Sequence, residues 1–466
     1  MSDRMSRWFN LILFAALPTL PELAKANTYI EMMTVHLDAP VTQLAPPTDS
    51  AFRKKSFAQR NSPEEVEKLA HELFTLWDWN QKACSRMSIT HRLKNQKEEI
   101  TKLYAQKRYQ DALDTFRAYF FAKVQLLWND EKGLVSRDFE GRHGRDYTIK
   151  NYEDNVTLLM ENIYQARTTK ETVHLGEMGA LRWDWQPEGL QNPWYIPTVF
   201  EYFASEHNFR TLWWKFIDTE DKQYLDKYLE YYDDYTINYR FQENLNPLNL
   251  DYGKQGHGNI EHFIHSLSEI ARVLPASGKG FPSTTLARIL IRQLTVVLPQ
   301  SVYYNREQSG NHSCGAVHVQ QYLSSFLYDF KIAKILEHES RRQFELYNTL
   351  VDLPDGSMYG RSAGYSRHEF TENGVYINKI READLEWLTP AVELEFQDRL
   401  ADRVFWYFNL FDAGGEHLNG VAAGRRNMDF TKRVNLVEKF QPGILRNKSL
   451  QALASTILRN QTKPDW

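Results

Sequence analysis

Cysteine and long apolar runs are both scarce in this chain of 466 residues. The two cysteines, Cys84 and Cys314, are too few for a disulfide framework. A single bridge between them stays open, although two ordinary, partly buried thiols are the simpler expectation. Beyond the N-terminal region, no apolar run reaches the roughly 20 residues that a membrane-spanning helix needs. We therefore expect no membrane span in the mature chain.

A strong charge of one sign is also missing. Lys and Arg number 56 and Asp and Glu number 60, which gives a formal net charge of −4. Such a balance does not indicate a nucleic-acid surface, so we expect no nucleic-acid partner. Binding of a polyanion would depend on a local basic cluster. Arg425-Arg426 with Lys432-Arg433 forms one such run, which is more typical of a solvated surface.

The strand pattern of alternating apolar and polar residues is absent, and so is any fixed sequence repeat. Helical periodicity dominates instead, beginning at Ser62, Pro63 and Glu65, which have the residue types of an N-cap, N1 and N3. Helices are expected over 62–77, 95–107, 109–127, 150–166, 221–242, 258–273, 284–299, 315–336, 338–353, 382–411 and 447–459. Short loops between such helices favour antiparallel hairpins. Because no repeat supports a regular solenoid, we predict an all-α fold, an α/α toroid in the form of an incomplete barrel.

The N-terminal region has the features of a secretory signal over residues 1–26. Arg4 and Arg7 precede an apolar stretch, and Ala24-Lys25-Ala26 is a small-x-small cleavage site. Residues 27–61 lack periodicity and carry three prolines, so we expect an extended linker there. The toroid, the expected catalytic domain, would then occupy residues 62–466, and the protein would be periplasmic or secreted.

Aromatic residues are unusually frequent, with 26 Phe, 25 Tyr and 12 Trp making up 14% of the chain. Most are expected to fill the core. For Trp183, Trp185 and Trp194 two interpretations stay open, because these rings can belong to the core or can stack on sugar rings.

The most informative segment runs from Gly310 to His368. Asn311-His312 stands at its start, ahead of an expected helix, and Asn311 alone could be an N-cap. Tyr365 follows one helical hairpin later, in a loop that contains glycine, Arg361 and Arg367. An amide, an imidazole and a phenol are the groups that β-elimination at a sugar acid requires.

These motifs resemble a known family. An Asn-His pair before a helix, followed by Pro354–Ser357 and then Arg361–Tyr365, is similar to the heparinase II/III-like polysaccharide lyases, which include alginate lyases. Lys107–Tyr119 resembles the helix that opens the toroid of that family, and Trp183–Trp194 resembles its Trp-rich segment. The resemblance implies an α/α toroid followed by a β-sandwich. It also implies cleavage of a uronate-containing polysaccharide, alginate or a glycosaminoglycan.

The implied chemistry gives each motif residue a role. Asn311 would hydrogen-bond the uronate carboxylate and stabilise the enolate that forms when the C5 proton leaves. Tyr365 and His312 would serve as acid and base, and Tyr365 would need nearby cations such as Arg361 and Arg367 because an unperturbed phenol has a pKa of about 10. The mechanism requires neither a metal nor another cofactor.

The sequence also departs from the family pattern. Gly360 and Ala363 replace a Glu and a Pro, and Gln255 stands where relatives tend to have Arg, with His257 nearby. We expect Gln255, His257, Arg361, Arg367, Trp185 and Trp194 to bind substrate. No β-sandwich pattern follows the helices, which leaves a missing domain or partner open. His257, His262 and His265 lack an accompanying carboxylate at metal-ligand spacing, so a metal site there is disfavoured.

Two alternatives remain at this stage. One is a non-catalytic glycan-binding toroid or truncated lyase remnant. The other is a glycoside hydrolase on an (α/α) barrel, which would need two carboxylates that flank the scissile bond. Asp184, Asp355, Glu369 and Glu372 are available, but Asp355 before Gly356 is better explained by turn formation.

Overall fold

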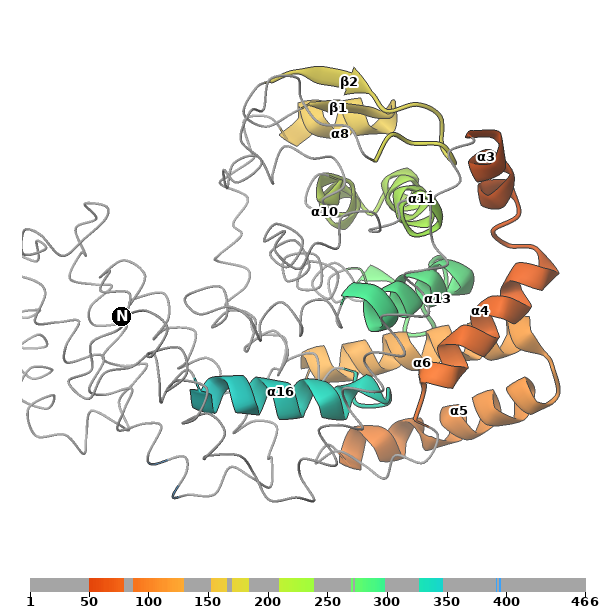
Figure 1. The fold of residues 1–466 in the computed structure, drawn as a ribbon, viewed down its shortest axis with the longest axis vertical. Coiled ribbons are helices and arrows are strands. Elements are labelled where there is room, and N and C mark those ends of the chain that lie inside the picture. Colours follow the sequence, from red (N-terminus) through yellow and green to blue (C-terminus); the bar gives the residue numbers. More distant parts are fainter. Residues whose placement is uncertain are drawn as a thin grey trace, which may run out of the picture.

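The computed structural model describes residues 50–78, 87–129, 152–165, 170–183, 209–238, 273–297 and 327–346, together with Ile270, Ala391 and Leu394. Within these ranges the chain is helical apart from one small hairpin (Figure 1). The elements are α3 (Ser50–Ala58), α4 (Pro63–Leu76), α5 (Met87–Ala105), α6 (Tyr109–Asn129), α8 (Tyr152–Met160), β1 (Ile163–Gln165), β2 (Thr172–His174), α10 (Arg210–Thr219), α11 (Lys222–Asn238), α13 (Ser283–Arg292), the π-helix η4 (Gln293–Val297) and α16 (Ile332–Leu346).

Helix α4 begins where the sequence predicts it. Ser62 has an extended backbone, and its side chain accepts a hydrogen bond from the backbone N–H of Glu65 at 3.3 Å. Pro63 occupies the first helical position, where its missing N–H costs nothing because that group has no partner within the helix. The predicted N-cap is therefore confirmed.

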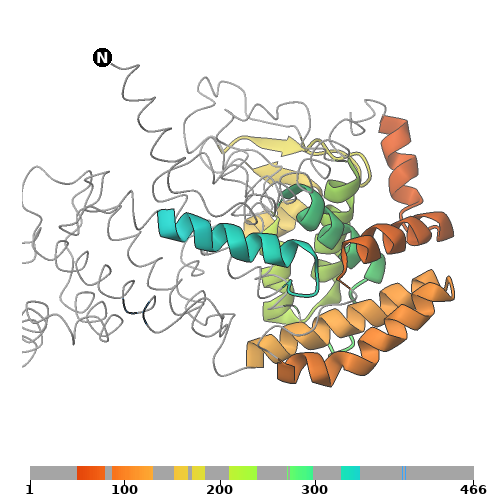
Figure 2. The ribbon, with the colours of Figure 1, turned by 60° about the horizontal axis from the view of Figure 1, so that its bottom comes forward.

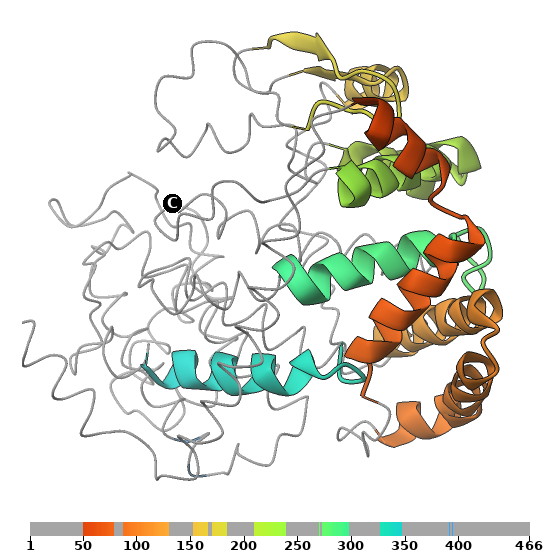
Figure 3. The same cartoon turned by 45° about the vertical axis from the view of Figure 1, so that its right-hand side comes forward.

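The helices pack as antiparallel pairs. Helix α5 pairs with α6, and α10 pairs with α11, each pair being joined by a short turn (Figure 1). A left-handed residue stands in each turn, Lys107 with φ 58° and Glu220 with φ 55°, and it reverses the chain direction. Helix α13 lies between the two pairs and contacts α4, α6 and α11, while α3 contacts α11 (Figure 3). This is the hairpin packing that the sequence predicts.

An early helix and a late helix of the described chain meet at the end of α4. The backbone N–H of Asp78 donates to the carbonyl of Asp329 at 2.7 Å, and that of Lys331 donates to the carbonyl of Leu76 at 3.0 Å. The turn that leads into α16 therefore lies against the end of α4 (Figure 2). In an open solenoid each unit contacts its neighbours along the chain only, whereas a ring brings distant units together.

A buried ion pair reinforces this junction. Lys123 of α6 is fully buried and Asp329 is 2% exposed, with 2.7 Å between Nζ and Oδ2. The ammonium also lies 5.0 Å from the ring centroid of Phe120 and 5.1 Å from that of Tyr328. Burial and the Asp329 carboxylate together raise the pKa of the Tyr119 phenol well above its ordinary value. The junction is thus a closed polar cluster within an aromatic shell.

Aromatic side chains of the described residues mainly fill the core. Around α4 and α6 the ring of Trp77 packs edge-on against Phe116, with centroids 5.0 Å apart, and stacks on Phe74 at 5.5 Å. Around α11 the ring of Phe209 stacks on Tyr231 at 5.6 Å and meets Tyr232 edge-on at 5.4 Å. Such pairs contribute about 0.5–1.5 kcal/mol each beyond their buried area. The expectation that most rings are structural is confirmed for this part of the chain.

Three predicted element boundaries are wrong in the N-terminal half, and one of them is the start of the helix expected at 95, which begins at Met87. Residues 50–58 fall within the expected linker but form α3, because packing against α11 stabilises a helix whose own sequence signal is weak. The helix expected over 150–166 ends at Met160. Asn162 adopts a left-handed backbone, and Ile163–Gln165 then pairs antiparallel with Thr172–His174. Strands of three residues are too short to show alternation in the sequence.

Two further boundaries differ beyond residue 283. The break expected between 336 and 338 is absent, since α16 runs continuously from Ile332 to Leu346 and is preceded by a turn at 327–330. That turn is imposed by tertiary contacts, the ion pair of Asp329 and the pairing of Phe330 with Trp77. The helix expected over 284–299 changes from α to π geometry at Gln293. Among the described residues no helix is long and apolar enough to cross a membrane.

The buried ion pair makes a stability prediction. Lys123→Met should lower the free energy of unfolding by about 3–5 kcal/mol, because it leaves the Asp329 carboxylate buried without its cation. Denaturant unfolding of the purified chain, followed by circular dichroism, measures this. The double variant Lys123→Met/Asp329→Leu should recover much of the loss, since neither charge remains. Lys222→Met, which removes an exposed pair with Asp226, is the control and should change little. Equal effects of Lys123→Met and Lys222→Met would contradict the prediction.

Candidate functional site

The residues that the sequence analysis selects for the site lie outside the described part of the chain. They are Asn311, His312, Tyr365, Arg361, Arg367, His257, Gln255, Trp185 and Trp194. The predicted site geometry is therefore not tested by the structure. The described elements nevertheless include those from which three of these segments continue along the sequence: Trp183 precedes Trp185, α11 precedes Gln255, and α13 with η4 precedes Asn311.

The first two of these elements, the loop that contains Trp183 and α11, are joined through one buried carboxylate, that of Asp234 on α11. Its side chain has no exposed surface and accepts a hydrogen bond from the backbone N–H of Gly179. The indole N–H of Trp183 donates to it at 2.7 Å, and the side-chain amide of Asn238 donates at 3.0 Å. The backbone N–H of Leu181 lies farther away, at 3.5 Å. Asp234 thereby ties the loop that follows β2 to the last turn of α11.

Two opposing effects act on the pKa of the Asp234 carboxyl. Burial raises the pKa of its carboxyl, and the hydrogen bonds from Asn238, Trp183 and the backbone act in the opposite direction. The Asp234 carboxyl is thus buried and surrounded by protein hydrogen-bond donors, the arrangement of a carboxylate that joins segments of the fold.

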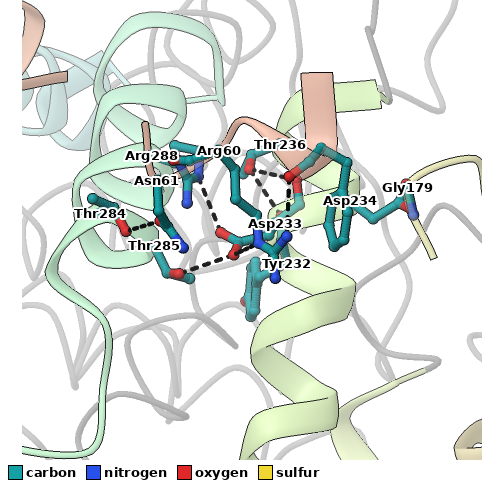
Figure 4. Close-up of polar contacts among 11 residues, drawn as sticks. Arg60, Asn61, Gly179, Tyr232, Asp233, Asp234, Thr236, Thr284, Thr285 and Arg288 are labelled. Carbon is teal, nitrogen blue, oxygen red and sulfur yellow. Dashed lines mark hydrogen bonds and ion pairs between the residues drawn. The ribbon is translucent and has the colours of Figure 1, made fainter. Parts of the chain in front are cut away.

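The preceding residue, Asp233, faces a different set of partners (Figure 4). Thr285 Oγ1 donates to it at 3.1 Å and Arg288 Nε donates at 3.0 Å, both from α13. Arg60 Nε lies 3.2 Å away, an ion pair without hydrogen-bond alignment, and the Arg60 carbonyl accepts from Arg288 Nη1 at 2.6 Å. Because consecutive helical residues point about 100° apart, Asp233 reaches α13 and the turn before α4, whereas Asp234 reaches the loop.

The next residue, Tyr235, completes the convergence. The guanidinium of Arg292, at the end of α13, lies 4.4 Å from its ring centroid, a cation–π contact. The ring of Trp183 meets the same tyrosine edge-on at 5.0 Å. We refer to Trp183, Asp234, Tyr235, Asn238 and Arg292 as the Asp234 cluster.

Two results here bear on the sequence interpretation. Trp183, left open between core and sugar stacking, is 3% exposed and belongs to the core, so stacking on substrate is excluded for this residue.

The sequence analysis did not single out Asp233-Asp234. A usable signal was present, because Tyr231-Tyr-Asp-Asp-Tyr235 places two carboxylates between aromatic residues on an otherwise amphipathic helix. Carboxylates that share a helix with core residues are expected to have dedicated partners.

Within the described ranges no three side chains of the types His, Cys, Asp or Glu are placed to hold a metal ion together. His262 and His265, like Cys84 and Cys314, lie outside those ranges.

Comparison with known proteins gives a result for the fold and none for the sequence. No protein-family model matches the chain, and no curated protein matches it significantly. Solved structures do match. A heparinase III with methylated lysines superposes with a TM-score of 0.59 at 11% identity, covering 83% of this chain and 56% of its own. The heparan sulfate lyase HepC from Pedobacter heparinus gives a TM-score of 0.52 at 13% identity, covering 77% and 53%. Another heparinase III gives 0.54 at 13% identity, covering 79% and 53%.

The likeness extends over most of this chain but only about half the length of those relatives. At such low identity it establishes the architecture alone. Heparinase III structures are helical toroids, and the described residues of this chain are mostly helical, with one two-stranded sheet. The chain therefore has the heparinase III-like helical toroid fold that the sequence predicts.

Proposed function

We propose that the protein is a polysaccharide lyase that cleaves a uronate-containing polysaccharide, alginate or a glycosaminoglycan, by β-elimination. The observation that carries the proposal is the coincidence of two independent likenesses. The fold is similar to structures named heparinase III and heparan sulfate lyase. The sequence separately contains an Asn-His pair and a later Tyr in the order typical of such lyases.

In the proposed mechanism the carboxylate of the uronate is the first group to be bound. Asn311 donates a hydrogen bond to it and stabilises the enolate that forms as the C5 proton is removed. Tyr365 and His312 transfer the protons. Tyr365 can both take the C5 proton and protonate the departing O4, whereas His312 is the base and Tyr365 the acid where the proton and the leaving group lie on opposite faces of the sugar.

The remaining candidates bind the chain of sugars. Arg361 and Arg367 supply positive charge beside Tyr365, and Gln255 and His257 contribute polar contacts. Trp185 and Trp194 stack on sugar rings, a role that the core position of Trp183 does not settle for its neighbours. We further propose that the protein is exported to the periplasm or secreted, as a signal over residues 1–26 indicates. A polymeric acidic substrate would be encountered there.

The proposal predicts a direct spectroscopic result. Incubation of the purified chain with alginate, heparan sulfate, hyaluronan or chondroitin should produce the ultraviolet absorbance of an unsaturated uronate with at least one of them. Asn311→Ala should lower the rate by about 10²–10³-fold, because a hydrogen-bond donor to the developing negative charge is lost. Asn95→Ala, on the exposed face of α5, is the matched control and should retain activity. New reducing ends without absorbance would indicate a hydrolase instead.

A second prediction separates a lyase from a binding-only toroid. Tyr365→Phe removes one hydroxyl and should abolish turnover while leaving oligosaccharide affinity close to wild type, as measured by calorimetry. Tyr224→Phe, at the start of α11, removes the same group from a tyrosine that is not a candidate site residue and should leave both properties unchanged. Binding without turnover in the wild-type chain would contradict the lyase and support the glycan-binding alternative.

A further inference from the structure

We propose that Arg60 and Arg288 form a binding site for a small oxyanion, of the chemical class of sulfate and phosphate. The site lies beside Asp233, where the turn before α4 meets the first two turns of α13 (Figure 4). Binding of this ligand is independent of the proposed lyase function. Three features point to it: an excess of positive charge, a buried donor without a partner, and two helix N-termini close by.

Two guanidinium groups share a single carboxylate at this junction. Arg288 Nε donates to Oδ1 of Asp233 at 3.0 Å, and Arg60 Nε lies 3.2 Å from Oδ2. In the part of the chain that the structure describes, neither arginine forms an ion pair with another carboxylate. The side chains of Arg288 and Asp233 are only 5% and 7% exposed, so water screens the excess positive charge poorly. A counter-ion would stabilise it.

Arg288 retains a hydrogen-bond donor for such a ligand. Its Nε binds Asp233, and its Nη1 donates to the carbonyl of Arg60 at 2.6 Å. Its Nη2 is buried and has no hydrogen-bond partner among the described residues. A buried donor without an acceptor is unfavourable, and a negatively charged oxygen is the strongest acceptor for a guanidinium N–H. The unused nitrogen and the excess charge therefore call for the same kind of ligand.

Arg60 opens the junction to solvent. Its side chain is 25% exposed, its Nη1 donates to the carbonyl of Phe57 at 3.0 Å, and its guanidinium lies 4.0 Å from the ring centroid of Phe57. These contacts hold the guanidinium in place before any ligand binds, which lowers the entropy cost of binding. A small ion can thus approach from the Arg60 side and meet two cations that are already positioned.

Two helix N-termini add positive potential at the same place. Helix α4 begins shortly after Arg60, and the side chain of Arg288 leans toward the N-terminus of α13, as helical side chains do. Thr284 Oγ1 donates to Oδ1 of Asn61 at 2.6 Å and so joins the two helix starts. Pro282, the N-cap residue of α13, provides no side-chain cap. Because the helix dipole favours negative charge near the first turn, both helices favour an anion here.

The experiment titrates the purified chain with sodium sulfate in a calorimeter, at constant ionic strength and at a temperature where circular dichroism shows every variant folded. Binding heat is the readout because sulfate also raises melting temperatures by exclusion from protein surfaces. The wild-type chain should bind sulfate saturably at millimolar concentration. N-acetylglucosamine 6-sulfate, titrated in parallel, distinguishes the source of the oxyanion. Binding of sulfate alone would identify a free inorganic ion, and binding of both would identify a sulfated sugar as a ligand too.

Four variants test the assignment. Arg288→Lys keeps the charge but removes the unused nitrogen, and Arg60→Gln removes the excess charge, so each should weaken sulfate binding by about tenfold or more. Asp233→Asn removes the competing carboxylate and should strengthen binding, an effect that general destabilisation would not produce. Arg108→Gln, which removes an exposed arginine paired with Asp111, is the matched control and should bind like wild type.

Arg60→Gln also serves if Arg288→Lys does not fold, because Arg60 is partly exposed and tolerates substitution more readily. Absence of saturable binding of either ligand to the wild-type chain would overturn the anion site. Binding that is unchanged in both Arg288→Lys and Arg60→Gln would overturn it as well, since the ion would then lie elsewhere. Equal weakening in Arg108→Gln would reduce the effect to overall charge and would count against the site. None of these results affects the lyase proposal.

Discussion

Two neighbouring carboxylates on α11 hold together three segments of the described chain that are far apart in sequence. Asp233 and Asp234 are buried in a helix rich in tyrosine, and a carboxylate in such surroundings is stable only if donors surround it. Hydrogen-bond donors come from α13 and from the loop after β2, and the turn before α4 adds the ion pair of Arg60. Since adjacent helical side chains diverge by about 100°, one short stretch of α11 fixes three separate segments.

A second polar junction closes the arrangement. Lys123 and Asp329 join α6 to the turn before α16, and backbone hydrogen bonds join that turn to the end of α4. Removing one charge of such a pair is far more destabilising than never having had the pair. Both junctions therefore specify which helices contact one another, while the aromatic core contains most of the buried apolar side chains. This division suits a toroid, whose ring form depends on contacts between elements distant in sequence.

Trp183, Asn238 and Arg292 come from three different elements and meet around Asp234 and Tyr235. Fold and function remain distinct conclusions. The heparinase III-like architecture is a structural finding, whereas the elimination chemistry follows from motifs and is a proposal, because one fold can carry different activities.

The sequence by itself determined the all-helical class, the hairpin packing and the N-terminal cap of α4 at Ser62, because helical periodicity and capping are local properties. It also selected the chemical groups of the candidate site, though not their geometry. Only the tertiary structure decided that residues 50–58 form a helix and that α16 begins after a turn at 327–330, since packing on α11 and the partner of Lys123 impose these features. It likewise decided that Trp183 is a core residue, because its hydrogen-bond acceptor is supplied by Asp234, which lies 51 positions away in the chain.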